Sequence, residues 1–166
     1  MPVKKIEIII RPLAGITRIQ HDEKNINFGM MQADVEAVLG APTQYTVNNL
    51  IKNVVEPRDG MQFIYELNDT KNTALDYIEI PIGAGLIVSY EGVNFFEDST
   101  EDVVSKLSRF DTPTPDNGKY MNFYQLGICL GGYGRKRIPE KKLVRVFPAE
   151  KQKSMEMMFK IGGGKI

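Results

Sequence analysis

The spacing of apolar side chains predicts extended strands along most of the chain. From Met61 to Leu67, apolar residues alternate with Gln62 and Glu66, and a period of two is typical of a half-buried strand. Other short apolar or β-branched segments are also predicted as strands, namely residues 4–11, 15–20, 75–80, 86–90, 120–130 and 143–147. The strands between residues 61 and 90 are expected to form an antiparallel meander.

A helical spacing replaces this alternation between residues 30 and 39. The apolar residues there recur at i, i+4, i+7 and i+8: Met31, Val35, Val38 and Leu39. This spacing predicts a short helix with one apolar face. Gly40 then favours helix termination, and Pro42 prevents the helix from continuing.

A second short helix is predicted after Ser99. Ser99 and Asp102 resemble a capping box with Asp in place of Glu, and Glu101 and Asp102 suit the positive end of the helix dipole. The apolar face of this helix consists of Val103, Val104, Leu107 and Phe110. A last helix is expected at residues 149–159.

The segments that contain the first two helices repeat each other. Asn94 follows Asn27 by 67 residues, and Asp102 follows Asp34 by 68. Each copy continues through a proline into a related apolar segment. An internal repeat on this scale indicates a duplicated supersecondary unit.

We therefore expect an α+β fold, an antiparallel sheet with short helices on one face, built from two related helix-plus-strands units. The chain is long enough for one domain and short for two. The domain is expected over residues 1–160, with the related units at about 26–90 and 93–148 and a flexible tail at 161–166.

Composition argues against general attraction to polyanions. The chain has 166 residues, with 21 Lys+Arg and 21 Asp+Glu, so its formal net charge is zero. A neutral chain has no global field that draws it to nucleic acid or an anionic membrane, and neither partner is expected. Cys129 is the only cysteine; it fits a reducing compartment and is expected in the core. No segment approaches a membrane span or the apolar part of a signal peptide, so we expect a cytoplasmic protein.

No motif indicates a reaction. His21 is the only histidine and lies beside Asp22 and Glu23, which a solvated turn explains better than a metal site with converging ligands. The glycine-rich segment 131–136 lacks the Gly-Lys-Ser/Thr of a phosphate loop, and helix capping accounts for the acidic residues 97–102. We expect no metal, cofactor or catalytic residue. The alternative is a small hydrolase or nucleotide-using enzyme of unrecognised type.

One local charge imbalance remains near the C-terminus. Six cations lie within eleven residues: Arg135, Lys136, Arg137, Lys141, Lys142 and Arg145. They are either a solubilising loop or a contact for an acidic protein or RNA. RNA binding by stacking requires interleaved aromatic residues, and only Tyr133 qualifies, so a protein partner is preferred. The predicted contact residues are Arg135, Lys136, Arg137, Lys141 and Lys142.

The segment from Phe28 to Pro42, FGMMQADVEAVLGAP, resembles the G-(M/T)-x-x-x-(D/E)-V-x-x-x-L-G-x-P signature of BamE/SmpA-like and β-lactamase-inhibitor-like proteins. This resemblance implies two helices on an antiparallel sheet and a role as a binding module. BamE-type proteins have an export signal and a lipobox cysteine, and this sequence has neither. Outer-membrane assembly is therefore not implied.

A second resemblance covers most of the chain. The segments DYIEI at 76–80, YEGVNFF at 90–96 and GICL at 127–130 are similar to segments of small cytoplasmic immunity proteins of bacterial polymorphic-toxin and contact-dependent inhibition systems. This resemblance implies a non-catalytic protein that binds and neutralises a cognate toxin domain. It transfers no functional residue and leaves the oligomeric state open.

Overall fold

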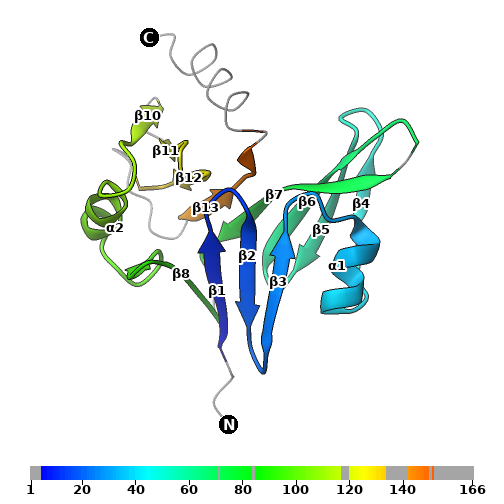
Figure 1. The fold of residues 1–166 in the computed structure, drawn as a ribbon, viewed down its shortest axis with the longest axis horizontal. Helices are drawn as coiled ribbons and strands as arrows, with labels where there is room; N and C mark the ends of the chain where they lie inside the picture. The colour runs from blue at the N-terminus through cyan, green and yellow to red at the C-terminus, as the bar shows by residue number, and fades with distance from the viewer. Residues whose placement is uncertain are drawn as a thin grey trace.

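The computed structural model describes residues 5–70, 72–83, 85–116, 120–133, 142–149 and 151. Over these ranges the chain forms an α+β fold with two β-sheets and two short helices, in which strands predominate (Figure 1). The predicted fold class is confirmed at this level. The tail at 161–166, and all of the last predicted helix except residues 149 and 151, lie outside the described residues.

The smaller sheet, sheet A, has the strand order β3-β2-β1-β8-β9. Its strands are β1 (Ile6–Arg11), β2 (Gly15–Ile19), β3 (Glu23–Asn27), β8 (Leu86–Tyr90) and β9 (Val93–Asn94). Strands β1, β2 and β3 form an antiparallel meander, whereas β8 pairs with β1 in parallel. Alternation along β1 buries Ile8 and Ile10 and leaves Glu7 exposed.

The larger sheet, sheet B, has the order β10-β11-β12-β13-β7-β6-β5-β4. Its strands are β4 (Thr46–Asn48), β5 (Asn53–Arg58), β6 (Met61–Leu67), β7 (Thr73–Pro81), β10 (Thr114–Asp116), β11 (Tyr120–Phe123), β12 (Ile128–Gly131) and β13 (Leu143–Val146). Strands β4–β7 form one antiparallel meander and strands β10–β13 form another. The last strands of the two meanders, β7 and β13, pair with each other in the middle of the sheet. The order is therefore symmetrical about this central pair.

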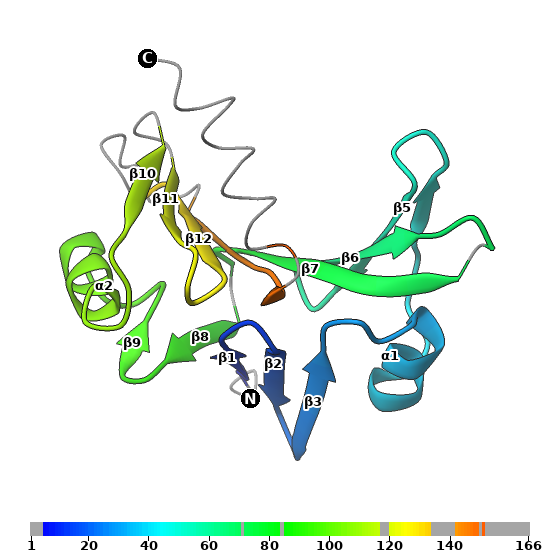
Figure 2. The same ribbon diagram turned by 45° about the horizontal axis from the view of Figure 1, so that its top comes forward.

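The helices lie beside sheet A, in the layer that faces sheet B (Figure 2). Helix α1 (Gln32–Leu39) follows β3, and helix α2 (Thr100–Leu107) follows β9. Because β3 and β9 are the two edge strands of sheet A, the helices lie at opposite ends of this layer. The core fills the space between the layers and includes Ile8, Phe63 and Ile78, none of which is exposed.

The predicted helix ends are confirmed. The Ser99 hydroxyl accepts a hydrogen bond from the Asp102 amide at 3.2 Å, which satisfies one of the free N–H groups of the first turn. Gly40 ends α1 at φ +88°, and its amide donates to the Glu36 carbonyl at 2.7 Å.

The helix faces that were predicted to be apolar pack into the core to different degrees. Val35, Val103 and Leu107 are fully buried, whereas Val38 and Leu39 are partly buried. The prediction is wrong for Met31 and Phe110, which lie just outside the two helices and are 41% and 47% exposed. Helix α1 therefore has a narrower buried face than the spacing of its apolar residues suggests.

Three expectations about the sheet are wrong. There are two sheets rather than one, and β8 leaves the expected 61–90 meander to pair with β1. Residues 120–130 form a hairpin, because Gly127 at φ +66° allows the chain to turn where a Cβ would lie 2.5 Å from the Phe147 carbonyl oxygen. Strands β3, β4, β5, β9 and β10 have no counterpart among the predicted strands.

Candidate functional site

The β4–β5 hairpin carries a group of exposed large apolar side chains. The exposed fractions are 95% for Leu50, 67% for Ile51, 55% for Tyr45 and 45% for Val47. We call these four residues the hairpin-tip surface. Strand β4 is an edge of sheet B, so the surface lies beside unpaired strand groups. Exposed contiguous apolar patches are uncommon on soluble proteins and often mark binding sites.

The backbone at the tip is held in one conformation. The Asn48 side-chain oxygen accepts hydrogen bonds from the amides of Leu50, at 3.0 Å, and Ile51, at 2.9 Å. Asparagine favours such local turns because its side chain replaces a backbone acceptor. The two aliphatic side chains therefore project from an ordered turn.

The tip is also attached to the rest of sheet B. The Leu67 amide donates to the Lys52 carbonyl at 3.0 Å, and Lys52 Nζ pairs with Asp69 Oδ1 at 3.0 Å. The neighbouring β6–β7 turn is ordered by Asn68, whose side-chain oxygen accepts from the amides of Thr70 and Asn72. The exposed ion pair adds little stability, but the backbone bond fixes the hairpin against its neighbour.

A buried polar network holds α1 against β5. Glu56 is almost fully buried; it accepts hydrogen bonds from Arg58 Nε, from Gln32 Nε2 at 3.2 Å and from the Tyr65 hydroxyl at 3.3 Å. Arg58 Nη2 also donates to the Gly40 carbonyl at 3.0 Å. Burial, and then the adjacent Glu56 carboxylate, raise the pKa of Tyr65 above its usual range, so its hydroxyl remains a donor.

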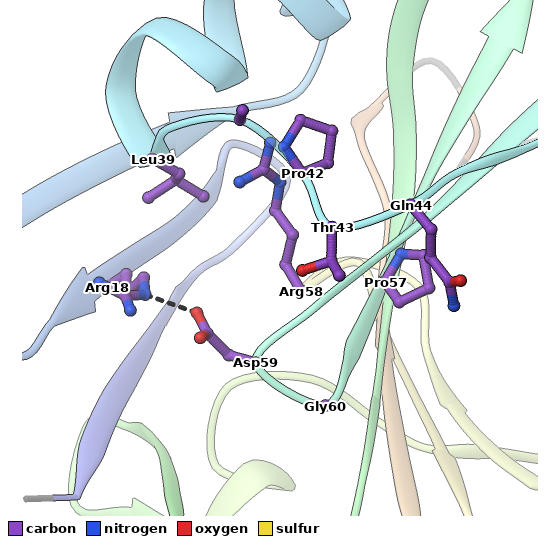
Figure 3. Close-up of a pocket in the computed structure, with 10 residues that line it drawn as sticks. Arg18, Leu39, Pro42, Thr43, Gln44, Pro57, Arg58, Asp59 and Gly60 are labelled. Carbon is purple, nitrogen blue, oxygen red and sulfur yellow. Dashed lines mark hydrogen bonds and ion pairs between the residues drawn. The ribbon is translucent and has the colours of Figure 1, made fainter.

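Between the two sheets lies a pocket of about 360 Å³ (Figure 3). Its walls come from β2, from the β5–β6 turn and from the link between α1 and β4. The close-up shows Arg18 joined directly to Asp59, while the Arg58 side chain extends toward Pro42 of the link, near Thr43. The pocket therefore combines two guanidinium groups, a carboxylate and a hydroxyl in a volume that suits a small ligand group.

The β5–β6 turn positions the carboxylate of this pocket. Asp59 has φ +53° and Gly60 has φ +87°, and positive φ at both central residues is the geometry that Asp-Gly favours in two-residue hairpin turns. The turn brings Asp59 Oδ2 to 2.7 Å from Arg18 Nε. This ion pair joins sheet B to sheet A.

Most of the predicted basic contact cannot be placed. Arg135, Lys136, Arg137 and Lys141 lie outside the described residues. Lys142 is described and is 9% exposed; its Nζ lies 4.9 Å from the centre of the Tyr133 ring. The Lys142 side chain therefore packs against its own protein.

Arg145, the last cation of that cluster, contacts side chains of the neighbouring strand β7. Its Nε donates to Glu79 Oε1 at 2.9 Å, and its guanidinium lies 5.4 Å from the centre of the Tyr77 ring. Arg145 and Glu79 are direct partners in the β13–β7 register, which makes this a cross-strand ion pair.

The other residues considered from the sequence take ordinary positions. His21 is exposed, and Cys129 is buried in a small cluster with Tyr124 and Phe147, as expected. Within the described residues, no three His, Cys, Asp or Glu side chains gather as metal ligands. In the same part of the chain, no helix has the length and apolar character needed to cross a membrane.

Neither the hairpin-tip surface nor the pocket is predicted by the sequence patterns. Asn48-Asn49 is a turn signal between apolar segments. Leu50 and Ile51 follow it directly, so the sequence did contain a sign that two aliphatic side chains lie within a turn. The pocket had no comparable signal, because Arg18 and Asp59 are 41 residues apart.

Comparisons with known proteins do not assign the chain to a family: no family model, no curated protein and no solved structure matches it.

Proposed function

We propose that this is a non-catalytic cytoplasmic binding protein, an immunity protein that neutralises a cognate toxin domain, and that the hairpin-tip surface contacts the toxin. The observation that carries the proposal is the exposure of Leu50 and Ile51 on a turn whose backbone is fixed by Asn48. The resemblance to immunity proteins supplies the class of partner.

An ordered turn with exposed aliphatic side chains favours association with a protein. Binding costs conformational entropy when loops become ordered, and a turn that is already fixed avoids much of this cost. The largest apolar patch on a typical monomer is about 300–600 Å² and is often functional. A standard interface buries about 800 Å² on each partner, so this surface supplies the apolar centre of an interface and neighbouring residues supply its rim.

The charges around the tip favour a protein over an anionic membrane. Membrane-inserting loops combine apolar residues with a collar of Lys and Arg. Here Lys52 is paired with Asp69, and Glu66 is exposed nearby on β6. Among the described residues around the tip, cations therefore do not outnumber anions.

The basic segment remains a second proposed contact. Arg135, Lys136, Arg137 and Lys141 are proposed to raise the rate of encounter with an acidic partner, because exposed charges act mainly on association rates. The hairpin-tip surface is instead proposed to provide the lasting contact.

We also propose that the fold arose by duplication of a BamE/SmpA-like unit. The first unit runs β3-α1-β4-β5-β6-β7 and the second runs β9-α2-β10-β11-β12-β13. Three observations support the proposal: both helices follow edge strands of sheet A, each unit adds a four-stranded meander to sheet B, and Val35 and Val103 occupy matching buried helix positions.

Protection of cells that express the toxin domain encoded by the adjacent gene tests the proposed function. Wild-type protein should restore growth, whereas the Leu50→Asp/Ile51→Asp variant should not, at equal soluble expression. Asn49→Asp, an exposed neighbour in the same turn, is the control and should protect like wild type. Protection by the double variant, or flotation of wild-type protein with anionic phospholipid vesicles, would argue against the proposed contact.

A further inference from the structure

One residue of the hairpin-tip surface, Val47, lies on the same side of sheet B as the pocket residue Arg58. Alternation puts Val54, Glu56 and Arg58 on one side of β5. Val47 is directly opposite Val54 in the β4–β5 register, and cross-strand partners face the same side of a sheet. Val47 therefore faces the same side of sheet B as Arg58, which lines the pocket.

The pocket arginines retain N–H groups that the protein does not use. Arg18 donates through Nε to Asp59 and through Nη2 to Gln20 at 3.1 Å, and Arg58 donates through Nε to Glu56 and through Nη2 to a main-chain carbonyl. Neither Nη1 atom has an acceptor among the described residues. Each guanidinium carries five donors in a planar fork, so donors remain for a ligand.

The spare donors belong to side chains that are mostly buried, yet neither Nη1 atom is among the fully buried polar atoms that lack a partner. The Arg18 side chain is 14% exposed and the Arg58 side chain is 8% exposed. A ligand can therefore reach these donors, and a carboxylate is the acceptor whose geometry matches the guanidinium fork. The pocket therefore favours a carboxylate.

The walls and the local charge indicate what carries this carboxylate. Leu39, Pro42 and Pro57 give the pocket apolar sides that suit the methylene groups of a side chain. Asp59 already neutralises Arg18 and Glu56 neutralises Arg58, so the site offers hydrogen bonds and orientation rather than a positive field. Such a site suits a single carboxylate better than a doubly charged phosphate.

We propose that the partner protein inserts one Asp or Glu side chain into this pocket while its apolar surface covers the hairpin tip. This inference rests on the proposed function and names the recognition chemistry of the partner. Gln44 on the pocket wall and Leu50 at the tip are six residues apart, a span of at most about 20 Å for an extended chain. A standard interface of about 800 Å² per partner covers both.

The described part of the second unit differs from the first at the turn that lines the pocket. The turn that corresponds to the β5–β6 turn by position is the β11–β12 turn, where Tyr124 and Leu126 are both 7% exposed and Gly127 packs against the Phe147 carbonyl oxygen. The first unit therefore keeps an open, charged turn where the second unit has a buried one, as expected if only the first unit binds the partner.

The pocket can be tested without the partner by NMR titration of the full chain, with the Nε–Hε signals of Arg18 and Arg58 as the readout. The probes are N-acetyl-glutamate methylamide, its neutral glutamine analogue and inorganic phosphate. The glutamate probe should shift both arginine signals saturably in the millimolar range, and the glutamine probe should not. Arg18→Lys keeps the charge but loses the fork, and it should weaken the glutamate probe about tenfold, whereas the exposed control Arg109→Lys should have no effect.

The outcomes separate this inference from the proposed function. No saturable shift with the glutamate probe, or tighter binding of phosphate than of glutamate, would overturn the carboxylate pocket. The wild-type titration decides the matter even if Arg18→Lys folds poorly. Leu50→Asp/Ile51→Asp should bind the glutamate probe like wild type while failing to protect cells, so the pocket and the tip can fail independently.

Discussion

Glu56 and Arg58, two residues apart on β5, together hold both ends of α1. Glu56 accepts from Gln32 in the first turn, and Arg58 donates to the Gly40 carbonyl at the C-terminal end. The two side chains are also an ion pair in which both partners are buried. Strand β5 therefore determines where α1 lies and where the link that lines the pocket begins.

Replacing Glu56 should destabilise the fold strongly. Glu56→Gln leaves the Arg58 charge buried without its partner, and loss of one partner of a buried ion pair costs about 3–5 kcal/mol. Glu66→Gln, at an exposed position of β6, should change the free energy of unfolding by less than about 0.5 kcal/mol. Urea denaturation measures both values. The Glu56→Leu/Arg58→Met variant, which removes both charges, should be more stable than Glu56→Gln. A double variant that is less stable would show that the unpaired Arg58 charge is not the cause of the destabilisation by Glu56→Gln.

Truncation to alanine should destabilise the protein strongly at Leu107 and hardly at all at Leu50. Leu107 is fully buried in the core, whereas Leu50 is 95% exposed. Leu107→Ala removes packed methyl groups and should cost about 2–5 kcal/mol, and Leu50→Ala should stay within about 0.5 kcal/mol. Thermal unfolding of the two variants provides the comparison. A similar loss for both would mean that Leu50 packs against the protein in solution.

Acid should selectively remove the contribution of Asp98. A hydrogen bond from the Asn94 amide, followed by one from Lys106, lowers the pKa of Asp98 below its ordinary value of 3.8. Folding therefore favours the charged carboxylate, so its stabilisation is complete above pH 3.8 and is lost as the pH falls through the lower folded-state pKa. The stability difference between wild type and Asp98→Asn, measured by urea denaturation, should shrink from neutral pH to about pH 2. A difference that does not change with pH would contradict this origin.

The sequence predicts elements whose signals are local. The alternation around Phe63 and the Ser99 cap depend on neighbouring residues, and both predictions are confirmed. Strand β5 was missed because it carries Glu56, Pro57 and Arg58, which are unusual in a strand with a buried face. These polar residues are accommodated by the network with α1, which the linear sequence does not show.

Long-range pairing explains the other differences. The parallel pairing of β8 with β1 brings Val88 beside Ile8, and nothing in the pattern of 86–90 distinguishes this partner from β7. The pocket depends on the same kind of contact, since Arg18 meets Asp59 only when the two sheets stack. An exposed apolar residue in a turn, such as Leu50, belongs to no helical or strand pattern, so the spacing of apolar residues does not predict its exposure.

The most direct test of the proposed function is the dissociation constant for the toxin domain that the proposal expects the adjacent gene to encode. It should be measured for wild type, for Leu50→Asp/Ile51→Asp and for the control Asn49→Asp. If the hairpin-tip surface is the centre of the interface, the double variant should bind about 30-fold or more weakly, equivalent to about 2 kcal/mol. Asn49→Asp should bind like wild type. Equal affinity of the correctly folded double variant and wild type would contradict the central claim.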